Sequence, residues 1–595
     1  MEQLLLKYMK INKRVIHYSL FIILILAAFL RIYKLSTIPP HLTPDEAALG
    51  YNAYSILKTG RDEYGKFMPM IFKSFGDYKP GLYVYLTTPF VAIFGLNEFA
   101  VRLPSALAGV MAVWLIYKIV SYLFPDKNFS LFTFHFSLGE ISALLLTISP
   151  WHLHFSRGAW EVNVSLTLTL AGIYFFLRAL DTNRLFGSSR AEPESLRMTS
   201  KGMNIIWSSI CFSLTLVTYQ GAKLSTLLVL MVLAIVFRKE VLELIKGSKK
   251  YIIAAFILGL VISSPALLSF FREETGRLEI YSVFSYPRKT EDVNRLLIQG
   301  NEEVGGLSYK LYHSEPLNFA RVIFGKWFNH FSGRFLFFEG DWPNPRHSVP
   351  NHGMLLLVDI LLLIVGLVVL IKLKGKAKWF ILLWLVLAPL PAILSRDQVH
   401  SVRAYNMVIP LTFVSSLGLM ILIKFIKRVP GTIIRNSYFT ILVLAFIGSL
   451  VYYFDSYYVH LSKHTSRFWS YGNKQIVETV TPIQGNYDKV KVQQSFAQPY
   501  IYFLFYQKYD PVEYQKQAKL TESQYKGDVG YVERLDNIYF WPINWPADRQ
   551  DHGTLVVADP IRIPEEDFSK ETNLRLLKEI RYLDGNLAFK VVEVN

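Results

Sequence analysis

The strongest constraint on this chain is a series of apolar stretches, each about as long as a bilayer's hydrocarbon core. A helix of about 20 apolar residues crosses roughly 30 Å of hydrocarbon, and stretches of that kind recur along the 595 residues. They predict an α-helical, multi-pass membrane protein with about eleven transmembrane helices. The predicted spans are 15–33, 100–124, 131–149, 162–180, 203–219, 222–237, 250–271, 352–371, 379–395, 404–423 and 436–454.

One further apolar stretch, 81–95, decides the orientation of the chain. It is short for a crossing and carries Pro89 in its middle. If it crosses, four short basic loops lie outside the cell, against the usual charge rule. If it does not, these loops lie with the N-terminus in the cytoplasm. We therefore predict an interfacial or re-entrant helix on the outer face and a protein of the cytoplasmic membrane. The four loops are 181–202, 238–249, 372–378 and 424–435.

Charge and cysteine content exclude several classes of protein. The net charge of +17 resides largely in those short loops, which argues against nucleic-acid binding. The single cysteine, Cys211, lies within an apolar span, so an intrachain disulfide or a cysteine metal cluster is excluded. The basic flank before residue 15 has no small-residue cleavage site, which predicts an uncleaved first helix. No Walker or Gly-x-Gly-x-x-Gly motif supports a nucleotide-dependent activity.

The last part of the chain changes character after the final span. Residues 1–454 form the predicted membrane domain, with outer loops 34–99 and 272–351, and 455–595 form a small extracytoplasmic α/β domain. Its short apolar runs predict strands alternating with helix. These runs are Lys489–Val492, Pro499–Tyr506, Gly553–Ala558 and Leu587–Val594.

Two adjacent carboxylates, Asp45 and Glu46, follow Pro44 directly after the first span. One interpretation is a helix start, where carboxylates meet the positive end of the dipole. Carboxylates beside a membrane are costly unless they face an aqueous cavity, and such residues are usually functional. A partly desolvated Asp45 can act as a general base towards a hydroxyl or amine.

A lysine lies at the same membrane face in the segment Asp77-Tyr78-Lys79-Pro80. Its ammonium can anchor the 81–95 helix by reaching the headgroups. The functional alternative is a ligand for a phosphate group, since an ammonium is a good point charge for that purpose.

Another polar stretch, 150–161, connects two predicted spans on the outer face. His152 and His154 are two residues apart and cannot share a helical face, so together with Trp151 they are predicted to form an aromatic interfacial belt. Arg157 and Glu161 are four residues apart and could form a salt bridge. Glu161, at the mouth of an apolar helix, is the candidate for a second carboxylate beside Asp45.

Two further outer turns carry cations. One contains Tyr219 and Lys223, and the other contains Arg396, His400 and Arg403. Cations on the outer side run against the charge rule, so something anionic is expected to hold them: lipid headgroups, or a phosphate-bearing substrate. The loop 338–348 adds weaker candidates, for which a solvated loop is the simpler interpretation. These candidates are Glu339, Asp341, Arg346 and His347.

These residues resemble the membrane glycosyltransferases of the GT-C fold. The resemblance rests on Pro-Asp-Glu after the first span and on three longer segments, 77–83, 94–109 and 156–161. The most similar group is glycosyltransferase family 39, which includes the dolichyl-phosphate-mannose–protein mannosyltransferases and is related to the lipid A aminoarabinose transferases. The match covers about residues 30–180, weakens further on and does not extend to the tail.

The resemblance implies transfer of a sugar from a polyprenyl-phosphate carrier to a protein, lipid or glycan acceptor at the outer face. It implies Asp45 as base or acceptor-positioning carboxylate with Glu46 beside it, and Lys79 as the phosphate ligand. Glu161 stands where relatives often carry Asp. Arg102 begins a helix that the family also starts with Arg-Leu-Pro, and we assign it a structural role. The predicted substrate- or phosphate-binding set is Asp77, Tyr78, Lys79, Arg157, Tyr219, Lys223, His400 and Arg403.

Three alternatives stay open at this point. Asp45 and Glu161 could hold Mg²⁺ or Mn²⁺ with phosphate oxygens completing the shell, or act without a metal. A lipid-linked saccharide transporter would also be basic, but it should show ionisable residues in mid-helix and symmetry between its halves. A membrane sensor with a sugar-binding tail leaves the polar residues at 45–79 unexplained.

Overall fold

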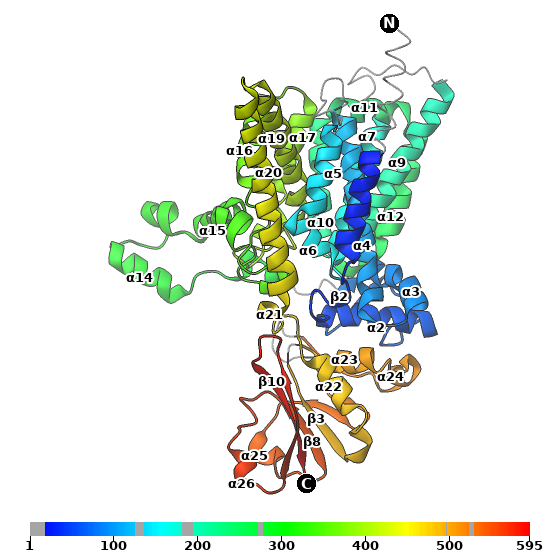
Figure 1. Ribbon diagram of the computed structural model, residues 1–595, viewed down its shortest axis with the longest axis vertical. Helices are drawn as coiled ribbons and strands as arrows, with labels where there is room; N and C mark the ends of the chain where they lie inside the picture. The colour runs from blue at the N-terminus through cyan, green and yellow to red at the C-terminus, as the bar shows by residue number, and fades with distance from the viewer. Residues whose placement is uncertain (1–17, 125–135, 181–193, 272–277, 496, 523–528) are drawn as a thin grey trace.

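The computed structural model describes residues 18–124, 136–180, 194–271, 278–495, 497–522 and 529–595. Figure 1 shows a bundle of long helices at one end, a domain containing the C-terminus at the other, and an arm that projects sideways from the bundle. The predicted basic N-terminal flank, the start of the predicted span 131–149 and most of the predicted loop 181–202 lie outside the described residues.

Each predicted span contains a helix over described residues. Six helical segments are long and apolar enough to cross a membrane, among them Glu98–Leu123 and Lys249–Ser269, and Tyr18–Ile32 and Leu138–Ile148 belong to a set of shorter apolar helices. The number of crossings stays a prediction. Besides Tyr18–Ile32, the helices are α4 (Glu98–Leu123), α5 (Leu138–Ile148), α7 (Glu161–Ala179), α9 (Glu194–Leu216), α10 (Ala222–Val236), α12 (Lys249–Phe271), α16 (Asp359–Lys372), α17 (Lys376–Leu387), α19 (Val408–Arg428) and α20 (Thr432–Asp455).

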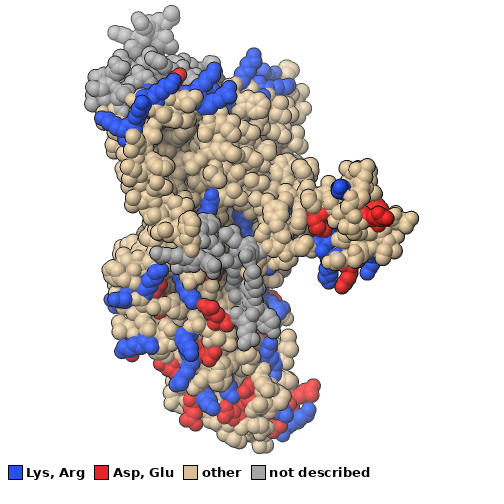
Figure 2. All heavy atoms as spheres, turned by 180° about the vertical axis from the view of Figure 1, so that it is seen from behind, with Lys and Arg blue, Asp and Glu red and all other residues tan. Residues whose placement is uncertain are grey.

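The distribution of charge divides the molecule into layers. On the face drawn in Figure 2, Lys and Arg gather at the end of the bundle away from the C-terminal domain, next to a broad belt almost free of charge. Large apolar side chains of the long helices are exposed, for example Ile253 of α12, Ile364 of α16 and Ile441 of α20. An apolar belt with a basic rim on one side is typical of a membrane-spanning bundle.

Several short elements cover the other end of the bundle. Helix α2 (Pro44–Thr59), the hairpin of β1 (Ile71–Ser74) and β2 (Asp77–Pro80), and α3 (Leu82–Phe94) lie between the bundle and the C-terminal domain (Figure 1). The apolar run 81–95 thus forms a helix beside α2 and not among the long helices of the bundle. This position agrees with the prediction of an interfacial helix.

The C-terminal domain is built on a six-stranded mixed sheet with the strand order β6-β7-β3-β8-β10-β9. Strand β3 pairs in parallel with β7 and β8, and β10 is antiparallel to β8 and β9. The strands predicted near 489, 553 and 587 are present. Their bounds are β3 (Lys489–Gln493), β6 (Arg534–Leu535), β7 (Ile538–Trp541), β8 (Thr554–Ala558), β9 (Leu574–Arg581) and β10 (Leu587–Val594).

Of the four apolar runs expected to form strands alternating with helix, 499–506 is the one that forms a helix. This segment is helix α23 (Pro499–Tyr506), with Pro499 in its first turn. Its first seven side chains are buried, and the six from Tyr500 to Phe505 belong to one apolar core that also contains residues of α2, α3 and the sheet. A short apolar run is compatible with a buried helix or a buried strand. Here the apolar residues that surround the segment on all sides favour the helix. The same core joins the C-terminal domain to α2.

Candidate active site

The first turn of α2 points two adjacent carboxylates in different directions. Thr43 caps the helix: its hydroxyl accepts a hydrogen bond from the Glu46 N–H, and the Thr43 N–H donates to Glu46 Oε2. This capping box fixes where the helix begins. Successive helical residues are about 100° apart around the axis, so Glu46 turns into the protein while 54% of the Asp45 side chain stays exposed.

Glu46 lies in a buried ion pair with Arg102. Arg102 Nε donates to Glu46 Oε1 at 3.0 Å, and the N–H of Ala159 donates to the same oxygen at 2.8 Å. The remaining guanidinium groups of Arg102 donate to the carbonyls of Leu35, Pro39 and His41. Both side chains are therefore saturated, and together they connect the first loop with α4 and the start of α7.

Asp45 forms the second ion pair, with Lys79. The hairpin that carries Lys79 turns at Phe75 and Gly76, both with positive φ (55° and 80°). A two-residue turn with positive φ at both positions matches the right-handed twist of the two strands that it connects. The Lys79 ammonium donates to Asp45 and lies over the Phe75 ring, 5.4 Å from its centroid. Burial alone would lower the pKa of Lys79. The negative charges of Asp45 and Glu161 outweigh this effect and raise the pKa, so the ammonium stays charged.

Glu161, Tyr219 and Arg403 extend this arrangement. Glu161 lies within electrostatic range of both Lys79 and Asp45, and Tyr219 lies within range of Glu161 and Arg403. The hairpin is tied to the Tyr219 turn by Gln220, whose side-chain amide donates to the Tyr78 carbonyl at 3.3 Å. Asp77 accepts a hydrogen bond from the N–H of Tyr78 and so shapes the turn. We refer to Asp45, Lys79 and Glu161 as the α2 site.

The loop carrying Arg403 is fastened to the loop 339–348 by a buried carboxylate. Asp341 Oδ2 accepts hydrogen bonds from the Ser401 N–H at 2.7 Å, from its hydroxyl at 2.8 Å and from His347 Nδ1 at 3.0 Å. Burial opposes ionisation, yet the hydrogen bond from His347 lowers the pKa of Asp341 to about 2. Asp341, expected to lie in a solvated loop, thus holds two loops together.

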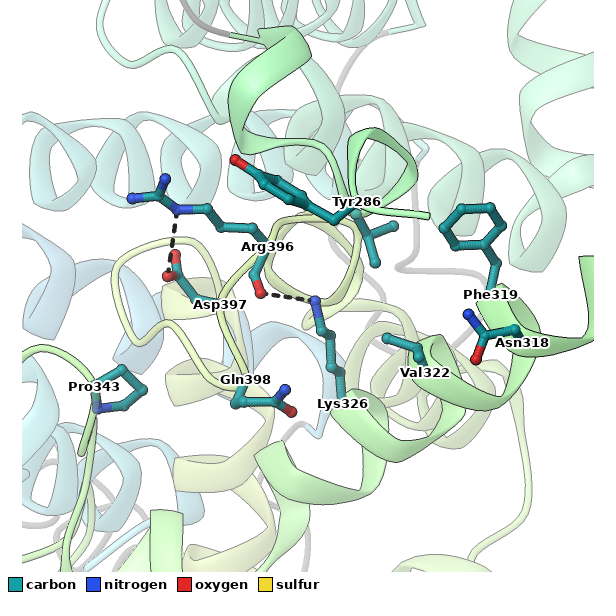
Figure 3. A pocket seen from close by; sticks show the side chains of 10 residues that line it. Tyr286, Asn318, Phe319, Val322, Lys326, Pro343, Arg396, Asp397 and Gln398 are labelled. Carbon is teal, nitrogen blue, oxygen red and sulfur yellow. Dashed lines mark hydrogen bonds and ion pairs between the residues drawn. The ribbon is translucent and has the colours of Figure 1, made fainter. Parts of the chain in front are cut away.

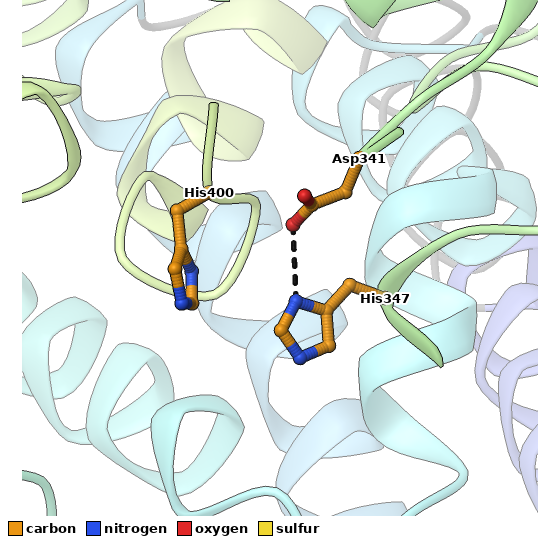
Figure 4. Close-up of side chains that lie close together, drawn as sticks. All are labelled: Asp341, His347 and His400. Atoms are coloured by element: carbon orange, nitrogen blue, oxygen red, sulfur yellow. Dashed lines mark hydrogen bonds and ion pairs between the residues drawn. The ribbon is translucent and has the colours of Figure 1, made fainter. Parts of the chain in front are cut away.

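One group among the described residues has the geometry to hold a metal ion: Asp341, His347 and His400, which we call the histidine cluster (Figure 4). Ligand atoms of the three residues lie within 4.8 Å of one another. Burial lowers the pKa of His400 well below its ordinary value, so this imidazole is neutral and does not supply the cation predicted there. Asp45 and Glu161, the predicted metal pair, are not part of this group.

A cavity of about 520 Å³ lies between the loop 395–403 and the base of the arm, which comprises residues 278–331 (Figure 3). Its wall combines Arg396, Asp397 and Gln398 with Tyr286 and Phe319 from the arm. Asp397 also contacts Arg403, with Oδ2 at 3.4 Å from Nη1. Sequence reasoning missed Asp397, although an acid within a loop of three candidate cations was a usable signal.

Other predicted residues lie away from the α2 site. Arg157 is fully buried and does not pair with Glu161: it donates to the carbonyls of Leu30, Tyr33 and Ile38 and to the Tyr457 hydroxyl. Its donors are thus used within the fold and not directed at a phosphate.

The predicted interfacial belt at 151–154 is also wrong, because Trp151, His152 and His154 are buried. His152 Nδ1 lies 2.7 Å from the Arg31 guanidinium, and His154 Nε2 lies 2.7 Å from the Arg346 carbonyl. Lys223 lies partly buried in the first turn of α10.

Known proteins share part of this sequence and the arrangement of its helices. Residues 78–188 match the dolichyl-phosphate-mannose-protein mannosyltransferase family. ArnT from Cupriavidus metallidurans superposes over 96% of this chain and 97% of its own, with 12% identity and a TM-score of 0.50 in the apo state. Bound to undecaprenyl phosphate, it gives 11% identity and a TM-score of 0.53 over the same shares. This chain has the GT-C fold.

The GT-C fold and the family match confirm the resemblance predicted from the sequence. The matched segment contains Lys79, Arg102 and Glu161, whereas Asp45 precedes it. The putative mannosyltransferase YycA of Bacillus subtilis (strain 168) is 29% identical over 170 residues, which are 28% of this chain and 22% of that protein. The match thus spans about a fifth of the length of that relative.

Proposed function

We propose that this chain is a glycosyltransferase that moves a sugar from a polyprenyl-phosphate donor to a protein, lipid or glycan acceptor. The observation that carries the proposal is the partly exposed ion pair between Asp45 of α2 and Lys79 of β2, two elements that lie between the bundle and the C-terminal domain (Figure 1). The protein would lie in the cytoplasmic membrane, with its N-terminus in the cytoplasm and its C-terminal domain outside. The GT-C fold and the ArnT complex with undecaprenyl phosphate support this donor class.

The proposed reaction is a displacement at the anomeric carbon. An acceptor hydroxyl attacks this carbon, the bond from the carbon to the phosphate oxygen breaks, and polyprenyl phosphate leaves. Asp45 takes the hydroxyl proton, and Lys79 and Arg403 stabilise the charge that develops on the phosphate. Glu161 orients the Lys79 ammonium, and Tyr219 lies within electrostatic range of Glu161 and Arg403.

Within this proposal Glu46 is a positioning residue and not a base. Its two oxygens accept hydrogen bonds from Arg102, Ala159 and Thr43, and no lone pair is directed towards the exposed face of α2. It fixes the first turn of the helix, and the helix turn fixes Asp45. Asp77 and Tyr78 act similarly, by shaping the hairpin that presents Lys79.

A divalent metal between Asp45 and Glu161 does not fit the residues present. The Lys79 ammonium already binds Asp45 and lies within electrostatic range of Glu161, so it occupies the place of the cation. A metal there would have to displace the lysine and bring two positive charges together. We therefore propose that the α2 site works without a metal.

The first test is sugar transfer from a panel of radiolabelled polyprenyl-phosphate sugars by purified, detergent-solubilised protein. Asp45→Asn should lower release of the sugar by about 10²- to 10⁴-fold, and Lys79→Ala should lower it by about tenfold at low donor concentration, while the protein stays folded. Lys73→Ala is the matched control, since Lys73 lies in the same hairpin as Lys79 but forms its ion pair with Glu522. No turnover by wild-type protein with any donor, together with unchanged lipid binding in both variants, would refute the catalytic role and favour a lipid-linked saccharide transporter.

A further inference from the structure

A side arm, residues 278–331, leaves the bundle at the end that faces the C-terminal domain (Figure 1). It is held at its base: Trp327 Nε1 donates to the Val386 carbonyl at 3.0 Å, and the buried Lys326 ammonium donates to the Ser395 carbonyl at 2.6 Å. Its elements are α13 (Leu278–Tyr281), η1 (Val283–Ser285), α14 (Thr290–Gly300), η2 (Tyr309–His313) and α15 (Glu315–Phe331).

The arm exposes far more apolar surface than the C-terminal domain. Among the described residues, eleven large apolar side chains of the arm are exposed, whereas residues 461–595 expose five such side chains over more than twice the length. Ile298 is 80% exposed, and Val304 and Leu307 are each 74% exposed. The same chain therefore buries its apolar residues where water surrounds it and leaves them uncovered on the arm.

So many exposed large apolar side chains on one segment require a partner. Removing apolar surface from water contributes about 25 cal/mol per Å², and contiguous exposed patches usually mark an interaction site. The bundle also exposes many large apolar residues, such as Ile441 and Leu444. We attribute that surface to contact with lipid, since it forms the uncharged belt.

The position of the arm and of its charges agrees with the same partner. In Figure 2 more of the arm's Lys and Arg side chains lie on the side nearer the C-terminal domain than on the opposite side, which carries fewer charges, of both signs. The arm carries both signs of charge, for example Arg288, Arg295 and Glu303. Helices with one apolar and one charged face lie in the plane of a membrane interface.

We propose that the arm lies in the outer leaflet of the membrane, with its apolar side among the lipid chains and its charged side in the headgroup layer. This contact would hold the base of the arm at the bilayer surface. The cavity lined by Tyr286, Phe319 and Arg396 would then open at the level of the headgroups. The proposal depends on the outer location of the arm and not on the reaction at the α2 site.

The test measures how deeply single spin labels lie in the bilayer. Cys211 is buried in α9 and is the one cysteine of the chain, so Cys211→Ala gives a background for single labels. Ile298→Cys, Leu307→Cys and Phe324→Cys report on the apolar residues of the arm. Ile441→Cys on the belt and Val512→Cys on the C-terminal domain are the lipid and water references. The full chain is placed at one copy per nanodisc of phosphatidylethanolamine and phosphatidylglycerol, and relaxation by oxygen is compared with relaxation by a water-soluble nickel chelate.

The proposal expects an oxygen-to-nickel ratio for the arm labels near that of Ile441→Cys and several-fold above that of Val512→Cys. A ratio equal to that of Val512→Cys at all three arm positions would overturn it. Shielding from nickel that occurs only at high protein density in vesicles, and not at one copy per disc, would also overturn it, because the partner would then be a second copy of the chain.

Discussion

Two ion pairs lie side by side at the start of α2, and they differ in almost every physical respect. Glu46 and Arg102 are buried, and each has further hydrogen-bond partners. Asp45 and Lys79 are partly exposed. Lys79 comes from the hairpin, and Glu161, which is distant in the sequence, lies within electrostatic range of both side chains. The two carboxylates are neighbours in the sequence, so composition and position along the chain do not distinguish them.

The difference teaches that burial, and not charge, separates the structural pair from the pair that we propose to be reactive. A buried pair is strongly destabilising to break, because a single charge is left without a partner. An exposed pair contributes little to stability, so its components are free to exchange partners with a substrate. The predictions below test this division.

The largest expected effect is on catalysis by Asp45. General-base catalysis contributes about 10²- to 10⁴-fold, so Asp45→Asn should lower kcat by that order with almost no change in Tm. Turnover of the labelled donor and a thermal unfolding curve on the same preparation check both statements. A wild-type kcat in the Asp45→Asn variant would remove Asp45 from the mechanism.

Breaking the buried pair should instead destabilise the protein. Arg102→Met leaves Glu46 as an unpaired buried carboxylate, with a cost of about 3–5 kcal/mol. Lys79→Met, the matched change in the exposed pair, should cost at most about 1 kcal/mol. Denaturant titration of both variants in the same detergent makes the comparison. Equal losses would contradict the division between a structural and a reactive pair.

A third carboxylate near α2, Glu63, makes stability depend on pH. Glu63 is buried beside Asn52 behind the site, and burial raises the pKa of Glu63 to about 8. Because the folded pKa lies above the ordinary value of 4.5, its protonated form favours folding. This stability is complete below about pH 4.5 and is lost as the pH rises from there through about 8, by up to about 5 kcal/mol.

Glu63→Gln should remove this loss, so that the variant is more stable than wild type at about pH 8–9. The measurement is Tm across about pH 5–9. Glu522→Gln changes an exposed carboxylate of the C-terminal domain and should leave the wild-type profile intact. If Glu63→Gln follows the wild-type profile, the carboxyl is ionised in the folded protein throughout.

The contribution of Lys79 to donor binding should be smaller. Lys79→Arg keeps the charge with a different shape, whereas Lys79→Ala removes it from the phosphate. We expect KM for the lipid donor to rise about tenfold in Lys79→Ala, equivalent to about 1.4 kcal/mol, and less in Lys79→Arg. A rise in KM that is equal in both variants would show that shape and not charge is required.

The smallest expected effect is that of metal removal. With Lys79 as the cation between Asp45 and Glu161, chelation by EDTA should change the turnover less than twofold. Restoration of activity by added Mn²⁺ or Mg²⁺ after chelation would place a metal in the reaction. His347→Ala tests the histidine cluster separately, by metal content of the purified protein before and after the substitution.

The sequence was sufficient for the helical bundle, for the proximity of two loops and for the resemblance to the GT-C glycosyltransferases. Long apolar runs have one solution in a bilayer, because each backbone polar group must be paired within the helix. The helix that starts at Pro44 and the hairpin at Phe75-Gly76 are local features that follow the first span closely. For this reason the sequence could predict that Asp45 and Lys79 lie at the same membrane face. The strands near 489, 553 and 587 followed from short apolar runs bounded by polar residues.

The tertiary structure decided which of the polar residues are available for chemistry. Arg157, His152 and His154 look like surface residues in a polar turn, but long-range partners such as Arg31 and Tyr457 draw them into the core. Segment 499–506 became a helix because the core between α2 and the sheet surrounds it. Glu46 found its partner 56 residues away. Burial and pairing at such separations depend on how the helices pack, and no local pattern in the sequence contains that information.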